Sequence, residues 1–430
     1  MRKLRVGALV AAGVLAGGFA TSASAADLGG NCCADLEERI AELEATTARK
    51  GNRKVSLTVS GWVGQQVTWW DDGGESNVYV NDLGSTLASH VKFTGQATIL
   101  PGWTAGYVLH LEAVGSDSLT INQDTPDGPS VLTGHANGVG VLQSFWFIKS
   151  DQLGKVSIGK QSQASDNAAI LVDGSGSLVP ANWVSFDVNA FNIRNRSTGE
   201  LTGLTWGGAG GCVWGDCNGL PTNSVRYNSP TFGGFSVSAS WGEDDFWDIA
   251  ARYAGDWGDF KVAGEVAYSQ SSDFNTNSVN MVQPAGSEYL QVGLYAEHVP
   301  TGLFIYGAYG HLDLNDDLTP NTGANETYYI KGGIRQRWVP LGHTILYGEY
   351  EHAENNALVD VDSGGSFDGS FIGTTAINMW GLGAVQEIDA AAMSLWLKYR
   401  HIDASATDID FGKLPTNSFQ ELTFGALINF

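Results

Sequence analysis

The sequence predicts an all-β protein, a 16-stranded antiparallel transmembrane β-barrel that follows a short N-terminal periplasmic helix or coiled coil. Three observations support this fold class. Residues 421–430 alternate apolar residues with polar or small ones, which gives a strand one face for lipid and one for water. Sixteen strand-like segments follow one another from residue 55 onward. The connections between them alternate between short and long, as in barrels whose two rims differ.

Residues 1–25 have the features of a secretory signal peptide. Three bases among the first five residues precede an apolar run over residues 6–20, and an Ala-x-Ala site ends at Ala25. This pattern predicts export and cleavage after Ala25. No later segment offers the roughly 18 consecutive apolar residues of a spanning helix, so we expect any membrane residence to come from a closed barrel.

Segment 26–52 contains the one convincing helix of the sequence. Leu36, Ile40 and Leu43 are separated by four and three residues, which places them on one a/d seam about two heptads long. One interpretation is a short periplasmic coiled coil between subunits. The other is a single amphipathic helix that lies under or inside the barrel.

The barrel is predicted over residues 53–430. None of the 11 prolines interrupts a proposed strand, as expected for a residue that cannot donate a hydrogen bond to a neighbouring strand. The clearest two-faced segment is 235–241, in which Phe, Val, Ala and Trp alternate with three serines. The sixteen expected strands span residues 55–66, 87–99, 102–113, 141–149, 155–161, 223–228, 235–241, 248–254, 260–268, 289–298, 303–310, 327–337, 344–351, 379–386, 392–401 and 419–430.

Seven short turns alternate strictly with eight longer connections. Outer-membrane barrels have short periplasmic turns and longer external loops. The even strand count then puts both ends of the barrel at the periplasmic rim, and the last strand must pair with the first to close the cylinder. We therefore expect Phe430 to mark barrel closure at that rim.

Acidic residues outnumber basic ones by 46 to 23, which gives a formal net charge of −23. This excess argues against nucleic acid as a partner and favours cations over anions near the protein. No cofactor or metal site is predicted. The acidic runs at residues 313–317 and 360–365 could bind calcium, but solvated loops are the preferred interpretation.

The four cysteines form two pairs in the sequence. Cys212 and Cys217 enclose four residues in a glycine-rich segment of a protein expected to be exported, so a small-loop disulfide is predicted. Cys32 and Cys33 are adjacent, and the sequence leaves open whether they bond to each other or between chains.

A channel is the default function, because sixteen strands enclose an aqueous lumen whereas eight are filled by their own side chains. Connection 162–222 is too long for an ordinary hairpin loop. Folded inward, it would narrow the channel and place charges across it; an external lid or a subunit contact is the alternative. The charged residues expected at this constriction are Asp166, Asp173, Asp187, Arg194, Arg196 and Glu200.

The polar face of each strand must be the inner one, which predicts the charges on the pore wall. Glu112, Glu265 and Glu349 accompany the inward bases, and each base could either meet solutes or pair with such a carboxylate. Lys160 shares parity with two apolar residues, so an inward Lys160 requires a bulge. The bases expected on the wall are Lys92, Lys160, Arg226, Arg252, Lys331, Arg335, Lys398 and Arg400.

Residues 55–430 resemble the general porins of alphaproteobacteria. The resemblance lies in the run Leu153-Gly-Lys-Val-Ser-Ile-Gly-Lys160, the block from Asn223 to Phe235, the entry strand at residues 55–62 and the terminal Phe430. It implies a homotrimer of sixteen-stranded barrels, each with its third external loop folded inward, in contact with outer-membrane lipid and lipopolysaccharide. It further implies that Phe430 is read during barrel insertion, and that Lys160 and Arg226 belong to a basic wall near the constriction.

The expected function is passive diffusion of small hydrophilic solutes and ions, with a preference for cations. One rival is a substrate-specific channel for sugars or phosphate, which an inward aromatic track of Tyr295, Tyr329, Tyr347 and Trp396 would favour. A barrel enzyme is not expected, because the eight histidines are scattered and no triad can be picked out by spacing. A structural or adhesive barrel is a third possibility, with cell-wall contact through the N-terminal helix.

Overall fold

The computed structural model describes residues 54–430 except 136, 243–244, 273–282, 315–322 and 363. The signal peptide and the coiled coil of Leu36, Ile40 and Leu43 lie outside the described residues and stay predictions. None of the helices in the described part of the chain is long and apolar enough to cross a membrane.

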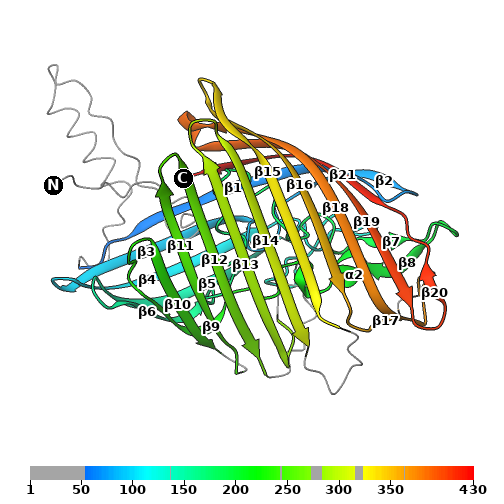
Figure 1. Cartoon of the computed structure of the whole chain (residues 1–430), viewed down its shortest axis with the longest axis horizontal. Coiled ribbons are helices and arrows are strands. Elements are labelled where there is room, and N and C mark those ends of the chain that lie inside the picture. The colour runs from blue at the N-terminus through cyan, green and yellow to red at the C-terminus, as the bar shows by residue number, and fades with distance from the viewer. Residues whose placement is uncertain (1–53, 136, 243–244, 273–282, 315–322, 363) are drawn as a thin grey trace.

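Sixteen antiparallel strands form the wall of a closed barrel, as the sequence predicts (Figure 1). The predicted segments correspond to these strands one for one, and most of the observed strands extend further toward the external loops. The wall strands are β1 (Thr58–Asp71), β3 (Ser89–Leu100), β4 (Trp103–Val114), β5 (Gly138–Ser150), β6 (Gly154–Gln161), β9 (Thr222–Asn228), β10 (Phe235–Gly242), β11 (Trp247–Trp257), β12 (Phe260–Ser271), β13 (Ser287–His298), β14 (Leu303–Leu314), β15 (Asn325–Val339), β16 (Gly342–Asn355), β18 (Ser370–Ile388), β19 (Met393–Asp408) and β21 (Phe419–Asn429).

The barrel closes between its last and first strands. β21 pairs with β1 in a register that runs from Trp62 opposite Asn429 to Asp71 opposite Gln420. Phe430 and Gly61 exchange two backbone hydrogen bonds of 3.0 Å, which continue the pairing to the final residue. The predicted closure is therefore confirmed, while a role of Phe430 in insertion stays a prediction.

The remaining elements lie in the long connections. In the connection after β6, a two-stranded sheet precedes two helices of three to five residues. The sequence pattern does not reveal these pieces, because each has only three to six residues and shows too few repeats of its period for a reliable signal. They are β2 (Ser76–Asn81), β7 (Asn192–Arg194), β8 (Leu201–Thr205), α2 (Trp206–Gly210), η1 (Cys212–Trp214), β17 (Val359–Val361), η2 (Asp389–Ala391) and β20 (Gly412–Leu414).

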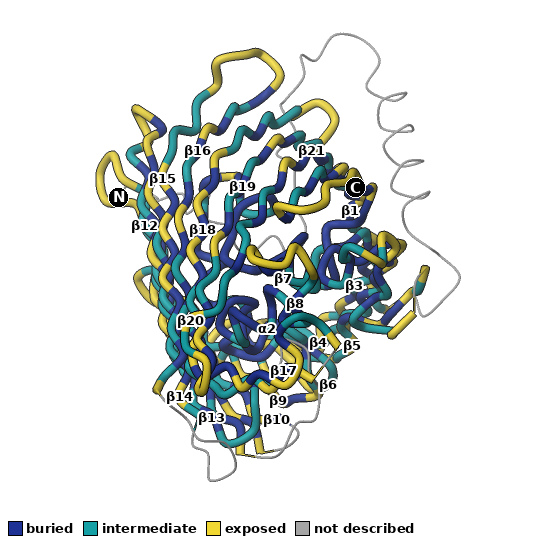
Figure 2. The backbone as a smooth tube through the Cα atoms, turned by 90° about the vertical axis from the view of Figure 1, so that its right-hand side faces the viewer, coloured by how far each residue is buried: buried dark blue, intermediate teal, exposed yellow. Residues whose placement is uncertain are grey.

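Side chains of the wall alternate between lipid and interior. On β21, Leu422, Phe424 and Ile428 are exposed on the outer surface, whereas Glu421 and Thr423 between them are fully buried inside. An inward residue of a wide barrel is buried only if something else fills the lumen beside it. Figure 2 shows buried backbone of the connection after β6, including α2, enclosed by the wall strands.

Candidate channel interior

The long loop, residues 162–221, leaves β6 and runs along the inside of the barrel. Its outgoing arm is tied in turn to β11, β14, β15 and β19 through the pairs Ser165–Asp248, Ala169–Tyr306, Asp173–Lys331 and Asp187–Lys398. The hydrogen bonds in these four pairs measure between 2.6 and 2.7 Å. The inner faces of β10–β19 that the loop touches are called the covered wall below.

The returning arm of the loop is fastened to the outgoing arm and to the wall. It carries the disulfide between Cys212 and Cys217, so that prediction is confirmed. The Asn355 side chain of β16 donates a 3.2 Å hydrogen bond to a carbonyl of α2. The backbone N–H of Asn167, in the outgoing arm, donates to Asp216 Oδ2 of the returning arm at 3.1 Å. The two arms therefore form one layer against the covered wall.

Aromatic side chains fill the space between this layer and the wall. Trp183, Phe191, Trp206 and Trp214 of the loop are all buried. The ring centroid of Phe191 lies 5.0 Å from that of Phe419 on the last strand. Full burial of one Phe side chain contributes about 1.5–3 kcal/mol. The loop is thus packed as part of a hydrophobic core.

Lys331 and Asp173 form an ion pair at the centre of the covered wall. Lys331 Nζ lies 2.6 Å from Asp173 Oδ2, and both side chains have 0% exposure. The ammonium also donates to the carbonyl of Ala181 at 2.7 Å. A lone buried charge would be costly, whereas this geometry satisfies both partners. The pair therefore fixes the loop to β15 and is shielded from solutes.

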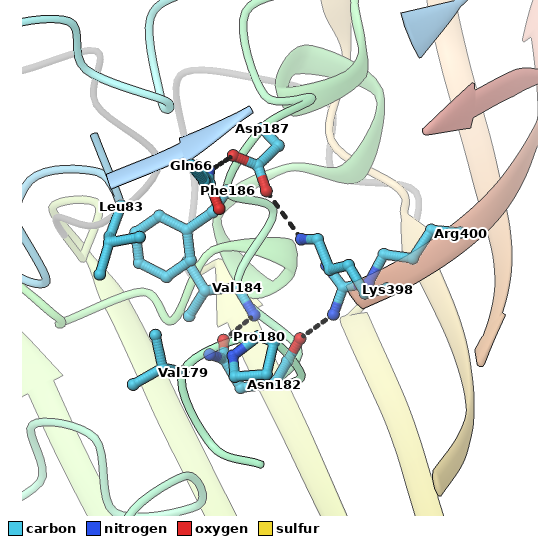
Figure 3. A pocket seen from close by; sticks show the side chains of 10 residues that line it. All are labelled: Gln66, Leu83, Val179, Pro180, Asn182, Val184, Phe186, Asp187, Lys398 and Arg400. Carbon is cyan, nitrogen blue, oxygen red and sulfur yellow. Dashed lines mark hydrogen bonds and ion pairs between the residues drawn. The ribbon is translucent and has the colours of Figure 1, made fainter. Parts of the chain in front are cut away.

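Lys398 and Arg400 hold the far end of the outgoing arm to β19 (Figure 3). Lys398 Nζ lies 2.7 Å from Asp187 and 3.2 Å from Glu421 of β21. Asp187 is a non-glycine residue in the left-handed region, with φ of 72°. Such a conformation is kept only where the surroundings fix it, and here the ammonium is one of the groups that does so. The cavity between these residues holds about 10 Å³, room for roughly one water molecule.

Arg400 pairs with a carboxylate of the wall itself. Its guanidinium contacts both oxygens of Glu349 on β16, at 2.9 and 3.0 Å, and donates to the carbonyl of Asn182 at 2.8 Å. Tyr329 donates to the same carboxylate at 2.5 Å. A two-pronged contact of this kind is among the stronger hydrogen-bonded pairs in proteins.

Arg252 and Arg226 anchor the start of the loop. Arg252 pairs with Glu265 of β12 at 2.6 Å and donates to the carbonyl of Ala164 at 2.7 Å. Arg226 donates to the carbonyls of Ser162 and Gln163, each at 2.8 Å. Both guanidiniums therefore serve the backbone of the loop. These two arginines fit the interpretation in which wall bases bind protein groups better than the interpretation in which they contact solutes.

Asp166 and Asp216 are buried where the two arms of the loop meet. Burial raises the pKa of Asp166 to about 7, against hydrogen bonding from Ser162 and the attraction of Arg226. Burial and the proximity of Asp166 raise the pKa of Asp216 well above its usual range. Two desolvated carboxylates that repel each other favour a state in which at least one of them is protonated. Asp166 is accordingly a structural acid of the loop junction.

Arg335 lies at the rim of the short turns. Its guanidinium contacts Glu387 of β18 at 3.0 Å and approaches His343 Nδ1 at 3.4 Å. The β15–β16 turn follows within a few residues. Arg335 is only partly buried, so it is neither enclosed by the loop nor fully exposed to solvent.

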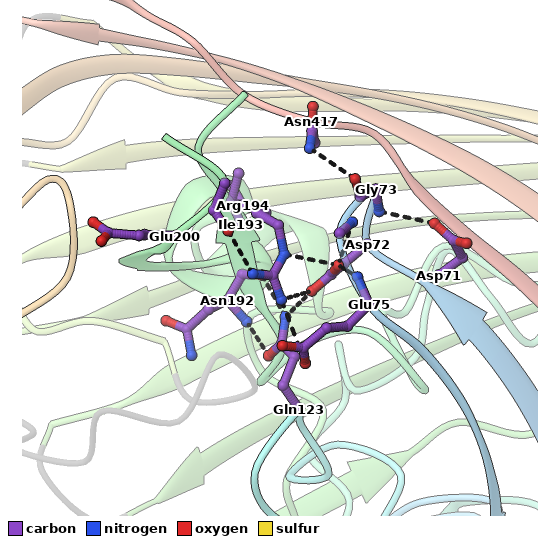
Figure 4. A network of polar contacts seen from close by, with 12 residues as sticks. Asp71, Asp72, Gly73, Glu75, Gln123, Asn192, Ile193, Arg194, Glu200 and Asn417 are labelled. Atoms are coloured by element: carbon purple, nitrogen blue, oxygen red, sulfur yellow. Dashed lines mark hydrogen bonds and ion pairs between the residues drawn. The ribbon is translucent and has the colours of Figure 1, made fainter. Parts of the chain in front are cut away.

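Arg194 requires a correction, because its side chain does not cross the channel. It contacts both oxygens of Asp72 at 2.9 Å and donates to the carbonyl of Gly199 at 2.7 Å (Figure 4). The backbone N–H of Asn417 donates to the Arg194 carbonyl at 2.8 Å. Asp72 and Asn417 belong to two other long connections, so Arg194 clamps three external loops together at the mouth. Burial opposes ionisation of Asp72, but hydrogen bonds from Arg194 and Gln123 outweigh it and lower its pKa.

Arg196 and Glu200 are likewise outside the predicted constriction. Both are exposed at the tip of the β7–β8 hairpin. Glu200 borders a polar hollow of about 520 Å³ that Asp124 and Gly364 also line. In the described residues, the side chains of Asp124 and Glu200 form no ion pair. These carboxylates lie at the external mouth of the barrel.

The placement of Lys160 inside the barrel is wrong. The pairing of β6 with β5 and β9 shows no register shift, so the bulge that it needed is missing from this strand. Ser157 and Gln161, four residues apart, are both buried. Lys160 lies on the opposite face, with Ile158. The inward base on this strand is Lys155, whose parity matches that of Ser157.

The inner faces of β3–β6, called the open wall below, receive less cover. Lys92 lies there among buried residues, whereas Gln96 further along β3 is exposed. Lys149 and Lys155 face each other across β5 and β6, and Lys155 Nζ lies 5.7 Å from the centroid of Phe147. Neither lysine forms an ion pair with a described residue. These two bases therefore remain available to solutes.

Some functional residues escaped the sequence analysis. Asp72 carries no strand signal, although the Asp-Asp-Gly-Gly run at residues 71–74 marks a turn. Lys155 alternates with the outward Val156 and Ile158, so strand parity could have found it. The proposed aromatic track is wrong in a different way: Tyr295, Tyr329, Tyr347 and Trp396 do face inward, but they are buried. They pack within the covered wall and offer no surface to a sugar.

Comparison with known proteins agrees with this geometry. The family model described as "Gram-negative porin" matches residues 8–413. The chain belongs to the Gram-negative porins. A comparison with curated protein sequences finds no significant match.

Solved structures share the fold of this porin at low sequence identity. The anion-selective porin from Comamonas acidovorans is 15% identical with a TM-score of 0.56, covering 87% of this chain and 100% of that one. OmpT, an outer membrane protein of Vibrio cholerae, is 14% identical with a TM-score of 0.52, covering 89% and 99%. Salmonella typhi OmpF, in complex with daunomycin, is 14% identical with a TM-score of 0.50, covering 88% and 98%.

Proposed function

We propose that this porin is a water-filled channel of the outer membrane through which small hydrophilic solutes and ions diffuse passively. The observation that carries the proposal is the contrast between the two inner walls. The loop lies along the covered wall, while Gln96 and Lys149 remain exposed on the open wall toward the short-turn end of a closed barrel. A lumen filled by the loop on all sides would leave such residues buried.

Planar lipid bilayers test this proposal. We expect stepwise conductance that grows in proportion to salt concentration and is insensitive to millimolar sugars or phosphate. Block by one of these solutes at low concentration would instead identify a substrate-specific channel. Absence of conductance from protein that runs as a folded, heat-modifiable barrel would support a structural or adhesive role.

We propose a preference for cations as part of this function. On the covered wall Lys331, Lys398 and Arg400 are paired with carboxylates, whereas the carboxylates of Asp124 and Glu200 at the mouth are unpaired among the described residues. Exposed acids raise the local concentration of cations over about a Debye length. The reversal potential in a tenfold KCl gradient is expected to have the same sign as the equilibrium potential of potassium.

One observation favours anions as a second candidate. Lys149 and Lys155 present two positive charges, the first exposed and the second half-buried, near the short-turn rim of the open wall. A structural neighbour from Comamonas acidovorans is described as anion-selective, although that likeness concerns the fold. A reversal potential with the same sign as the equilibrium potential of chloride would favour this candidate over cation preference. It would not affect the channel proposal.

We propose further that the barrel assembles as a homotrimer within the alphaproteobacterial general porins. The two internal sequence blocks of residues 153–160 and 223–235 support that subfamily. A structure of the Vibrio cholerae OmpT protein is described as a trimer form. Mass measurement of the detergent-solubilised protein, with the detergent contribution subtracted, tests the oligomer.

A further inference from the structure

Two phenylalanines of β5 face the lumen on the open wall. Phe145 and Phe147 alternate with Trp146 and Ile148, which are 48% and 38% exposed on the outer surface. Residues two apart on a strand share a face, so both phenylalanines point inward together with Lys149. A water-filled interior offers no hydrophobic reason to place two aromatic rings there. Nothing in the channel proposal uses them.

These rings differ from the inward aromatic residues of the covered wall. Tyr306 and Tyr329, for example, are 0% and 3% exposed beneath the loop. Phe145 and Phe147 are only half-buried. Part of each ring therefore remains uncovered inside the barrel, where a solute can reach it.

Glycines on the two neighbouring strands make room for the rings. Gly106 of β4 is opposite Phe147, and Gly159 of β6 is opposite Phe145. A Cβ atom at Gly106 would lie 2.3 Å from Cζ of Phe147, so this ring lies directly against the β4 backbone. Gly159 has a φ of 135°, a conformation that residues with a side chain rarely adopt. The Phe147 ring therefore lies along the wall.

Two ammonium groups adjoin the rings. Lys149 and Lys155 are opposite each other on β5 and β6, and Lys155 Nζ lies 5.7 Å from the centroid of Phe147. This distance is within the range of a cation–π contact. Neither lysine forms an ion pair with a described residue. The four side chains, called the aromatic–lysine patch below, are Phe145, Phe147, Lys149 and Lys155.

The chemistry of the patch selects its occupant. Aromatic rings attract one another in offset or edge-to-face arrangements, which contribute about 0.5–1.5 kcal/mol beyond the area they bury. Ammonium groups without a protein carboxylate attract an anionic group. A neutral sugar would leave the lysines unmatched, inorganic phosphate has no ring, and an organic cation would be repelled. A small solute that joins an aromatic ring to a carboxylate matches both halves of the patch.

We propose that the aromatic–lysine patch is a weak binding site for small aromatic carboxylates in transit through the lumen. The solute ring packs against Phe145 and Phe147, and its carboxylate contacts Lys149 and Lys155. The inference rests on the proposed channel and names one solute class that the channel favours. A site within a channel must bind weakly enough to release its solute, so the expected dissociation constant is in the millimolar range.

Planar bilayers that contain the full-length protein test the proposal. Benzoate is added to KCl solutions of constant ionic strength, and its dissociation constant is taken from the decrease in conductance. Cyclohexanecarboxylate has the same charge and a similar size but no aromatic ring. We expect benzoate to bind at least about threefold more tightly than cyclohexanecarboxylate.

Two variants separate the contributions of the rings and the charges. Phe145→Leu/Phe147→Leu keeps the surface apolar but removes both rings, so the dissociation constant of benzoate should rise at least about threefold. Binding of cyclohexanecarboxylate should change little. Lys149→Gln/Lys155→Gln should weaken the binding of both carboxylates by about fivefold or more.

The matched control is Trp146→Leu/Lys160→Gln, which changes one aromatic residue and one base on the outer faces of the same two strands. It should bind benzoate as the wild type does. Three outcomes would overturn the proposal: equal binding of benzoate and cyclohexanecarboxylate, unchanged benzoate binding in the ring variant, or an equal loss in the outer-face control. If the ring variant does not fold, Phe147→Leu alone replaces it and should weaken benzoate binding measurably.

A second readout separates this inference from the proposed channel. Saturation-transfer NMR of the detergent-solubilised protein detects benzoate binding without any ion current. Benzoate binding that the ring variant weakens, in protein that gives no conductance, would refute only the channel. Normal KCl conductance with benzoate binding in neither assay would refute only the aromatic–lysine site.

Discussion

The covered wall and the open wall carry the same kinds of charged residue in different surroundings. Beneath the loop, Lys331, Lys398 and Arg400 are buried, and each contacts a carboxylate. On the open wall, Lys149 and Lys155 form no ion pair with a described residue. Desolvated charges must be paired, whereas hydrated ones need no partner. Position relative to the loop therefore decides whether an inward charge supports the fold or meets solutes.

The most disruptive test of this comparison removes one partner from the covered wall. Lys331→Met leaves the Asp173 carboxylate buried without its base, and breaking such a pair costs about 3–5 kcal/mol. We expect a lower midpoint temperature for thermal unfolding, which is measured from the change in gel mobility of the heated barrel. The double variant Lys331→Met/Asp173→Leu should recover most of the loss, because an apolar pair can replace a buried ion pair. Failure to recover would mean that the pair does more than hold the loop.

A second test addresses the clamp at the mouth, where Arg194 and Asp72 are both buried. Arg194→Gln removes charged hydrogen bonds worth about 1.5–3 kcal/mol each and should release the β7–β8 hairpin. Because the pKa of Asp72 is lowered, its contribution is present above the usual carboxyl pKa of about 3.9 and is lost as pH falls below that value. The protection of residues 192–205 against hydrogen exchange, corrected for the pH dependence of intrinsic exchange, should therefore be high at pH 6 and lower below about pH 4.

Asp72→Asn is the matched variant for this second test. It should exchange rapidly at both pH values, because no carboxylate remains to titrate. Exchange in the wild type that is equally slow across this range would contradict the clamp.

A smaller effect is expected from the open wall. Lys155→Gln removes a half-buried charge that has no ion-pair partner among the described residues, and the interaction between unit charges 4 Å apart in water is about 1 kcal/mol. The cation-to-anion permeability ratio should rise by up to about fivefold, as measured by the reversal potential in a KCl gradient. Lys160→Gln is the matched control on the outer face of the same strand. An equal shift in both variants would mean that the effect is not transmitted through the lumen.

The smallest effect is expected at the external mouth. Glu200→Gln should lower the cation preference only slightly, because the carboxylate is exposed and screened over about 10 Å at 0.1 M salt. The difference from wild type should vanish at about 1 M salt, where the screening length is about 3 Å. A difference that persists at high salt would place Glu200 in a narrower passage than the hollow at the mouth.

The barrel could be predicted from sequence because its signals are periodic and repeated. Alternation within residues 235–241 and 421–430 assigned faces, and the strict order of short and long connections supplied the strand count. Side-chain parity also placed Lys331, Lys398 and Arg400 on the inner face. Parity is fixed by the covalent geometry of a strand, so a single sequence contains it.

The path of the loop could not be predicted in the same way. Arg194 and Asp173 both lie in one irregular connection, yet one clamps the external mouth and the other is buried against β15. Their partners, Asp72 and Lys331, are more than a hundred residues away in sequence. Such pairings depend on how the loop packs around Trp183, Trp206 and Trp214. This packing leaves no periodic pattern in the sequence. Lys160 failed for a different reason: its parity pointed outward, and the inward placement required a bulge that β6 does not contain.

The central claim is that charges on the covered wall support the fold while charges on the open wall meet solutes. The reversal potential of the double variant Lys331→Met/Asp173→Leu in a tenfold KCl gradient tests it most directly, since two opposite charges leave the interior together. We predict a reversal potential equal to that of the wild type, beside a clear shift for Lys155→Gln. A shift in the double variant as large as that of Lys155→Gln would show that the buried pair lies in the path of ions and would contradict the claim.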